Sequence, residues 1–192
     1  MTQRTRPVKK PSGNRRQHGQ RGFTLFELIV VVSIISILSG VALTKYFGLL
    51  VDVERTSMEQ NLGAMRSAVA LQMLDHIAKD DMAGVVAMAD TNPMSYMVQT
   101  PGNYLGALDN PVPAKIAGGD WYYDKKEKVL VYRVEHSSYF RTSLAGPSRA
   151  EFNIALAYQD VNHDGRFEPG TDSFEGLLVK PLKPYRWLKE PI

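Results

Sequence analysis

An apolar run from Phe23 to Thr44 is the strongest pattern in the chain, and it contains a single charged side chain, Glu27. Leucine, isoleucine and valine occupy all sides of the helical wheel, whereas a surface helix of a soluble protein has a polar face. A helix of these 22 residues extends for roughly 33 Å, about the thickness of the hydrocarbon core of a bilayer. The pattern therefore predicts a membrane-spanning helix. The alternative is a buried core helix of a soluble protein.

Beyond this run, the hydrophobic residues fall on one side of a helix. They recur at steps of three or four, which predicts a single apolar stripe: Met58, Leu62, Met65, Val69 and Met73. The charged residues fall elsewhere around the wheel: Glu54, Arg55, Glu59, Arg66 and Asp75. We therefore predict one long helix from about Thr24 to about Lys79, whose second half packs on a folded head. Asp80 and Asp81 end this pattern and are expected to cap a short helix over residues 82–89.

The remaining pattern is that of a small β-sheet. Residues 90–120 are rich in proline and glycine, so a structured loop region is expected there. Aromatic and β-branched residues at 121–123 and 129–134 flank a polar turn, which predicts a hairpin. Further strands are expected over residues 150–159 and 176–180. A helix packed on an antiparallel sheet gives an α+β fold.

Charge and composition change this picture in two ways. Seven of the 23 basic residues lie in residues 1–22, which contain no acid, so the net charge of +3 hides an acidic body. The basic pI of about 9.0 would otherwise favour a nucleic-acid partner, which we therefore do not expect. Basic residues beside an apolar segment stay cytoplasmic, which predicts an exported head. The absence of cysteine excludes disulfides, thiolate metal sites and cysteine nucleophiles.

Glu27 distinguishes this segment from an ordinary secretory signal. Such a signal also has a basic region, an apolar region and small residues, here Ser39, Gly40 and Ala42. The basic region is unusually long, however, and a carboxylate inside an apolar run costs a few kcal/mol unless it is paired. We therefore expect Glu27 to have a role. The alternative is a carboxylate that snorkels to the membrane interface.

The string from Arg21 to Leu28, RGFTLFEL, closely resembles the class III signal of type IV pilins and type II secretion pseudopilins. It places Gly22 before the cleavage point, Phe23 after it and Glu27 at the fifth position of the mature chain. The resemblance covers residues 1 to about 75. It implies a pilin-like α+β fold, a long N-terminal helix packed on a small antiparallel sheet. The implied parts are a removed leader (residues 1–22), a transmembrane or filament-core half of the helix (23–50), an amphipathic half (51–79) and an exported head (80–192).

The resemblance also implies how the segment works. A prepilin peptidase cleaves between Gly22 and Phe23 on the cytoplasmic side, and the new Phe23 amine is methylated. The carboxylate at the Glu27 position pairs with the N-terminal ammonium of a neighbouring subunit, because each charge is costly alone in an apolar filament core. The implied partners are other pilin or pseudopilin subunits, this peptidase and the inner-membrane assembly platform. Many pilins carry a helix-bending proline where this chain has Thr44.

The implied location follows from the same resemblance. It is the bacterial inner membrane, crossed once, with a cytoplasmic N-terminus and a periplasmic head, and afterwards the pilus or pseudopilus.

Residues 160–172 match the start of an EF-hand-like calcium loop. Oxygen ligands at positions one, three and five precede a glycine at position six, as calcium loops require. Position twelve is Thr171 instead of glutamate. The predicted calcium site is therefore weaker than an EF-hand, and its residues are Asp160, Asn162, Asp164, the Arg166 carbonyl, Glu168 and Asp172. The alternative is a surface loop rich in Asx turns that binds no metal. The major pseudopilin of type II secretion is similar in using calcium in a comparable region.

Three functions stay open at this point. The first is a structural subunit of a type II secretion pseudopilus or type IV pilus. The second is a membrane-anchored or filament-tip module that binds a partner with the help of calcium. The third is a secreted enzyme, which we do not expect because no triad, HExxH or phosphate-loop motif is present. The missing cysteines and the calcium-like loop favour the secretion-type pseudopilins.

Overall fold

The computed structural model describes residues 23–191, and it begins with a long helix. Helix α1 spans Leu25–Ala78, and the short helix α2 spans Met82–Ala87. The chain divides into two units after Leu43. The described part of the first unit is the apolar segment 23–43, and the second unit begins at Thr44. Both predicted helices are confirmed, whereas the predicted leader, with Gly22, lies outside the described residues.

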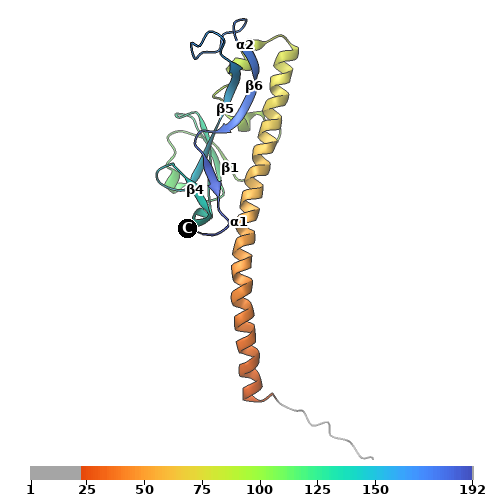
Figure 1. Ribbon diagram of the computed structural model, residues 1–192, viewed down its shortest axis with the longest axis vertical. Coiled ribbons are helices and arrows are strands. Elements are labelled where there is room, and N and C mark those ends of the chain that lie inside the picture. Colours follow the sequence, from red (N-terminus) through yellow and green to blue (C-terminus); the bar gives the residue numbers. More distant parts are fainter. Residues whose placement is uncertain (1–22, 192) are drawn as a thin grey trace, which may run out of the picture. The chain divides into compact units, whose positions relative to one another are not determined.

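The second unit contains two sheets. The larger has the strand order β1-β2-β3-β5-β6 and the smaller pairs β4 with β7 (Figure 1). The larger sheet consists of β1 (Tyr104–Leu108), β2 (Trp121–Asp124), β3 (Val129–Arg133), β5 (Arg149–Gln159) and β6 (Ser173–Pro181). The smaller sheet consists of β4 (Phe140–Thr142) and β7 (Tyr185–Trp187). Three 3₁₀ helices lie in the connections: η1 (Pro93–Tyr96), η2 (Pro113–Lys115) and η3 (Ser137–Tyr139).

The four predicted strands are confirmed, and three others were not predicted. Strands β2 and β3 form the expected hairpin, and β5 and β6 follow at the expected places. Strand β1 lies in the region expected to be a loop, and it pairs with β2 in parallel, with Tyr104 opposite Trp121. The sheet is therefore mixed, and not wholly antiparallel as predicted. The α+β class with a long N-terminal helix is confirmed.

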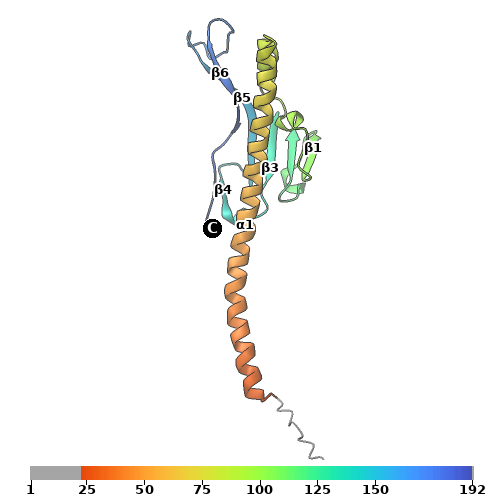
Figure 2. The same cartoon turned by 90° about the vertical axis from the view of Figure 1, so that its right-hand side faces the viewer.

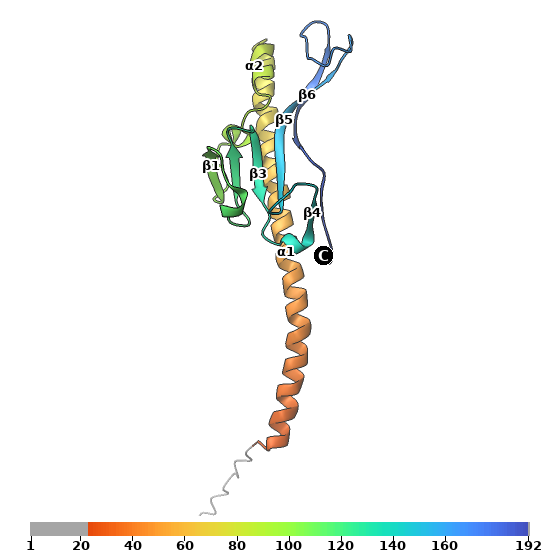
Figure 3. The same ribbon diagram turned by 90° about the vertical axis from the view of Figure 1, so that its left-hand side faces the viewer.

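The core of the second unit lies between the later half of α1 and one face of the larger sheet (Figures 2 and 3). The predicted stripe supplies the helix side of the core: Met58, Leu62, Met65 and Val69 are at most 2% exposed, and Met73 packs against them. The sheet side is aromatic. The Trp121 ring packs on Tyr132 and Phe152, with ring centroids 4.8 and 5.9 Å apart. The methionine stripe is therefore core, as predicted.

The burial of Glu54 contradicts its predicted place on the polar side of the helix. The sequence analysis places it among the polar positions, but its residue surface is only 7% exposed. It lies three residues after Val51 and four before Met58, which are both buried. These are the steps of the apolar stripe itself, so the same spacing argument places Glu54 on the core side.

The buried Glu54 carboxylate is surrounded by hydrogen-bond donors from the end of β3. Its Oε1 accepts from the Tyr132 hydroxyl at 3.1 Å and from the Glu135 N–H at 2.7 Å. Its Oε2 accepts from the His136 N–H at 3.0 Å and lies 2.6 Å from His136 Nδ1. Burial, with the nearby Glu54 charge, raises the pKa of the Tyr132 hydroxyl far above its ordinary value, so this group stays a donor. Glu54 therefore fixes α1 to the sheet.

A tight reversal follows the end of α1. Asp80 adopts a positive φ of 55°, and Asp81 caps α2, as predicted. Asp81 Oδ1 accepts from the Gly84 N–H at 2.8 Å, and Oδ2 lies 2.8 Å from His76 Nδ1. The Gly84 hydrogen bond, followed by the contact with His76, holds the pKa of Asp81 below its usual value.

This cap gives a pH-dependent prediction. Asp81→Ala should lower the thermal midpoint of the head at about pH 7, because the cap and the contact with His76 are lost. The pKa of Asp81 is lower in the folded state than in the unfolded state, where it is about 3.9. The ionised carboxylate therefore stabilises the fold at pH values above about 3.9, and this contribution is lost as the pH falls through the folded-state pKa. The difference between wild type and variant should therefore shrink towards about pH 3 in circular-dichroism melts. A difference that stays constant contradicts the ionic role of Asp81.

Candidate functional site

The candidate assembly site is the start of α1. Thr24 caps the helix: its Oγ1 accepts from the Glu27 N–H at 3.2 Å, and its carbonyl accepts from the Leu28 N–H at 3.1 Å. Threonine followed by glutamate three residues later is the sequence form of a capping box. An acidic side chain in the first turn also stabilises the positive end of the helix dipole. The sequence analysis missed this second role of Glu27, although the spacing from Thr24 carries the signal.

The apolar side chains around Glu27 are exposed. Phe23 is 78% exposed, and each large apolar residue between positions 25 and 43 is at least 39% exposed. The most apolar window of α1 has a mean hydropathy of 2.5, and none of it is buried. Among residues 23–191, α1 is the one helix that is long and apolar enough to cross a membrane. Such a surface needs lipid or other apolar helices as a cover.

The polar groups of this segment differ in how they are satisfied. The hydroxyls of Ser33 and Ser36 donate to the carbonyls of Ile29 and Val32, each at 2.8 Å. Both hydroxyls are therefore compatible with an apolar surrounding. Within the described part of the chain, by contrast, no cation forms an ion pair with the Glu27 carboxylate.

A comparison with known families decides what this segment is. The prokaryotic N-terminal methylation motif matches residues 17–43. The chain carries a prepilin-type N-terminal segment. This match confirms the resemblance to type IV pilins and pseudopilins. The prepilin-type segment includes Phe23, Glu27 and the exposed apolar part of α1 up to Leu43.

Two curated relatives are similar to part of this chain. Prepilin peptidase-dependent protein D of Escherichia coli (strain K12) is 43% identical over 65 residues, which are 34% of this chain and 44% of that protein. Type IV major fimbrial protein FimA of Dichelobacter nodosus is 30% identical over 92 residues, which are 48% of this chain and 49% of that protein. The chain thus spans about half the length of these relatives, or less. No solved structure matches the chain.

The loop predicted to bind calcium lies between β5 and β6, and its first carboxylate is turned towards the loop's own backbone. Asp160 Oδ1 accepts from the His163 N–H at 2.6 Å, and Oδ2 accepts from the Gly165 N–H at 2.8 Å. Gly165 has a positive φ of 77°, which glycine adopts without strain. Asp160 therefore braces the turn.

The last predicted ligand braces the other end of the loop. Asp172 Oδ1 accepts from the Val161 N–H at 3.0 Å, and its Oδ2 accepts from the Glu168 N–H at 2.8 Å. Phe167 of the loop packs its ring between those of Tyr158 and Phe174, with ring centroids 5.4 and 6.0 Å apart. The loop is thus closed by hydrogen bonds and held by an aromatic cluster.

The middle of the loop brings the other predicted ligands together. The Asn162 amide donates to Asp164 Oδ2 at 3.3 Å and to Glu168 Oε2 at 3.2 Å, while Asp164 Oδ1 accepts from the Arg166 N–H at 2.8 Å. Among residues 23–191, no group of three or more histidine, cysteine, aspartate or glutamate side chains is placed to hold a metal ion. The side chains satisfy one another and the backbone, as in the metal-free alternative. The calcium site stays a prediction from spacing.

Proposed function

We propose that this chain is a structural subunit of a type II secretion pseudopilus or type IV pilus, assembled through its N-terminal helix. The observation that carries the proposal is the prepilin-type segment at residues 17–43, whose exposed apolar helix belongs to the same α1 that forms the core of the head. Before assembly, lipid would cover the apolar residues. In a filament, the same residues of neighbouring subunits would cover one another.

The assembly role of Glu27 follows from its surroundings. A carboxylate among exposed apolar side chains is costly once lipid or other helices cover them, unless a positive charge lies nearby. Cleavage before Phe23 creates an amine four residues away in sequence. The ammonium of a neighbouring subunit supplies the missing charge in our proposal, and methylation leaves that amine able to carry it.

The relatives support the structural role. The Dichelobacter nodosus protein is named a major fimbrial protein, and the Escherichia coli protein is named for its dependence on prepilin peptidase. We propose the same processing here, with the platform of the inner membrane as a further partner, a cytoplasmic N-terminus and a periplasmic head. The absence of cysteine and the acidic loop favour the secretion-type pseudopilus.

The processing step gives the first test of this proposal. The intact mass of the protein extracted from membranes should correspond to a chain that starts at an N-methylated Phe23. Deleting the peptidase should leave the mass of the full precursor. A mature chain that starts near Val41 or Leu43 would show an ordinary secretory signal, and it would refute both the filament subunit and the anchored binding module.

Calcium gives a second, smaller test. A ligand that binds only the folded head raises its stability, by about 1.4 kcal/mol at tenfold excess over Kd. Calcium at about 1 mM should therefore raise the thermal midpoint relative to chelator, and Asp164→Asn should abolish this shift. This variant keeps the Oδ1 acceptor for the Arg166 N–H, and it removes the charge together with the Oδ2 acceptor of the Asn162 amide. Equal midpoints with calcium and with chelator would remove the metal site.

A further inference from the structure

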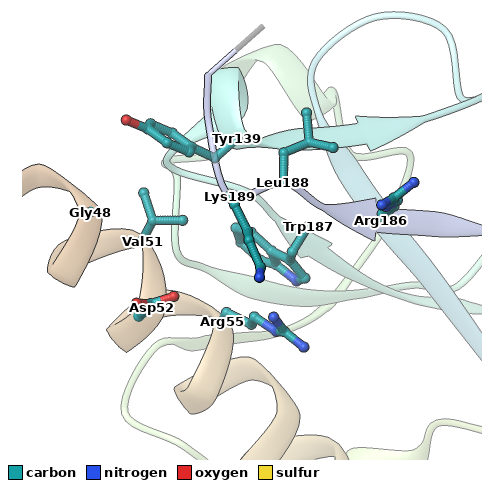
Figure 4. A pocket seen from close by; sticks show the side chains of 9 residues that line it. All are labelled: Gly48, Val51, Asp52, Arg55, Tyr139, Arg186, Trp187, Leu188 and Lys189. Carbon is teal, nitrogen blue, oxygen red and sulfur yellow. The ribbon is translucent and has the colours of Figure 1, made fainter.

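A basic pocket lies at the end of the head where α1 first packs against the C-terminal segment. It has a volume of about 510 Å³, and Figure 4 shows the side chains that line it. Lys189 and Trp187 come from the C-terminal segment, and Asp52 and Arg55 come from α1. Arg186 of β7 completes the charged lining. The lining of the pocket therefore contains three cations and one carboxylate.

Two cations of the smaller sheet face each other. Arg186 lies directly opposite Arg141 in the register of β4 and β7, and both side chains are exposed. Like charges directly opposite each other destabilise a strand pair. Within residues 23–191, neither arginine nor Lys189 forms an ion pair, whereas Arg55 is bound to Glu59 at 2.9 Å. We call Arg141, Arg186 and Lys189 the basic surface.

Trp187 adds an aromatic side chain to the lining of the pocket. A carboxylate bound at the pocket would supply the basic surface with a counter-charge.

The acidic loop 160–172 has the complementary chemistry. Asp160 and Asp172 brace its backbone, whereas Asp164 and Glu168 are exposed and are held together by the Asn162 amide. In the described residues, no carboxylate of this loop forms an ion pair, not even with Arg166. Without calcium, the loop therefore presents two neighbouring carboxylates that no cation neutralises.

The two surfaces cannot meet within one molecule. The loop lies beyond the far ends of β5 and β6, and β4 and β7 lie at the opposite end of the head (Figures 1 and 3). When a surface at one end of a molecule complements a surface at the other end, copies join head to tail. Such contacts build an open helical filament unless the copies close into a ring. We infer that the acidic loop of one copy docks on the basic surface of the next copy, with Asp164 and Glu168 as the contacting carboxylates. This inference rests on the proposed function, because it describes how heads in a filament contact one another.

Disulfide trapping tests the contact in the full-length chain, which contains no cysteine of its own. Ser143→Cys lies beside the basic surface and Thr171→Cys lies on the acidic loop, and both positions are exposed and uncharged. Oxidised filaments from cells that express both variants should contain cross-linked dimers. Cells that express either variant alone, or Ser143→Cys with the exposed control Ser95→Cys, should give none. Incorporated subunits without the Ser143–Thr171 link overturn the docking and leave the proposed function intact.

Charge reversal provides an independent measurement. Arg186→Glu and Glu168→Arg should each lower incorporation into filaments at least about tenfold, because each places like charges together. The double variant in one chain should restore incorporation, since the exchanged pair 186–168 then regains opposite charges at each contact between copies. Loss without restoration, or a cross-link from Ser143→Cys to a different protein, overturns the second copy as the occupant. A wild-type chain that forms no filament overturns the proposed function and this inference with it.

Discussion

Glu27→Ala should abolish incorporation into filaments while the protein remains in the membrane. The exposed apolar residues of α1 are unchanged in this variant, and removing a charge from such a segment favours insertion into the bilayer. A filament of the variant contains an unpaired N-terminal ammonium for each subunit, among apolar helices. Breaking one half of a buried charge pair costs about 3–5 kcal/mol, which is a loss of more than a hundredfold for each contact.

Two further variants separate charge pairing from helix capping. Glutamine also satisfies a capping box, so Glu27→Gln preserves the helix start with Thr24 and removes the negative charge. Pairing predicts that Glu27→Gln is as defective as Glu27→Ala, whereas capping alone predicts normal assembly. Glu59→Ala is the matched control, because it removes an exposed carboxylate of the same helix and should assemble normally. The readout is the fraction of methylated protein found in sheared or purified filaments.

Glu54→Ala should be the most destabilising substitution of a charged residue in the head. It removes the acceptor of the Tyr132 hydroxyl, of two backbone N–H groups and of the His136 ring, all within 3.1 Å. Buried donors without acceptors cost about 1–3 kcal/mol each, and some will find water at the half-buried His136. We expect the free energy of unfolding to fall by about 3 kcal/mol.

The measurement is denaturant unfolding of the detergent-solubilised protein, followed by the fluorescence of Trp121 and Trp187. Glu54→Gln should be less harmful than alanine, since its carbonyl oxygen still accepts from part of the donor set. Glu59→Ala again serves as the control, because an exposed ion pair contributes at most about 1 kcal/mol. If Glu54→Ala lowers the free energy of unfolding no more than Glu59→Ala does, the hydrogen-bond donors around Glu54 do not stabilise the head as proposed.

The sequence was most informative where one local pattern extends over many residues. The apolar run, the periodic stripe from Met58 to Val69 and the polar turn that joins β2 to β3 are local patterns, and the structure contains each predicted element. Strands β1, β4 and β7 are as short as β2 and β3, but none of them is joined to its partner strand by a short polar turn. Their pairing is decided by distant segments, so the local pattern contains no signal for it.

The candidate sites likewise divide into those formed by residues close in sequence and those formed by residues far apart in sequence. Phe23 and Glu27 were found because a processing signal is contiguous, and the acidic loop was found because its carboxylates are close in sequence. The basic surface was not found, because Arg141 and Arg186 come together only through the pairing of β4 with β7. Glu54 is different again. Its spacing was visible, but a carboxylate on an apolar stripe contradicts the usual rule that charged residues face water, and only the donors from β3 explain it.

The position of Glu54 along α1 also has a mechanical consequence. Val51 and Glu54 are the first described residues of α1 that are buried in the head. In a filament under tension, force that travels along α1 from the membrane side enters the head near Val51 and Glu54. The hydrogen bonds of Glu54 to the backbone of Glu135 and His136 then bear load together, and they must break together before the methionine stripe can slide. The sheet would therefore resist separation from α1 at the end of the head where the force is applied.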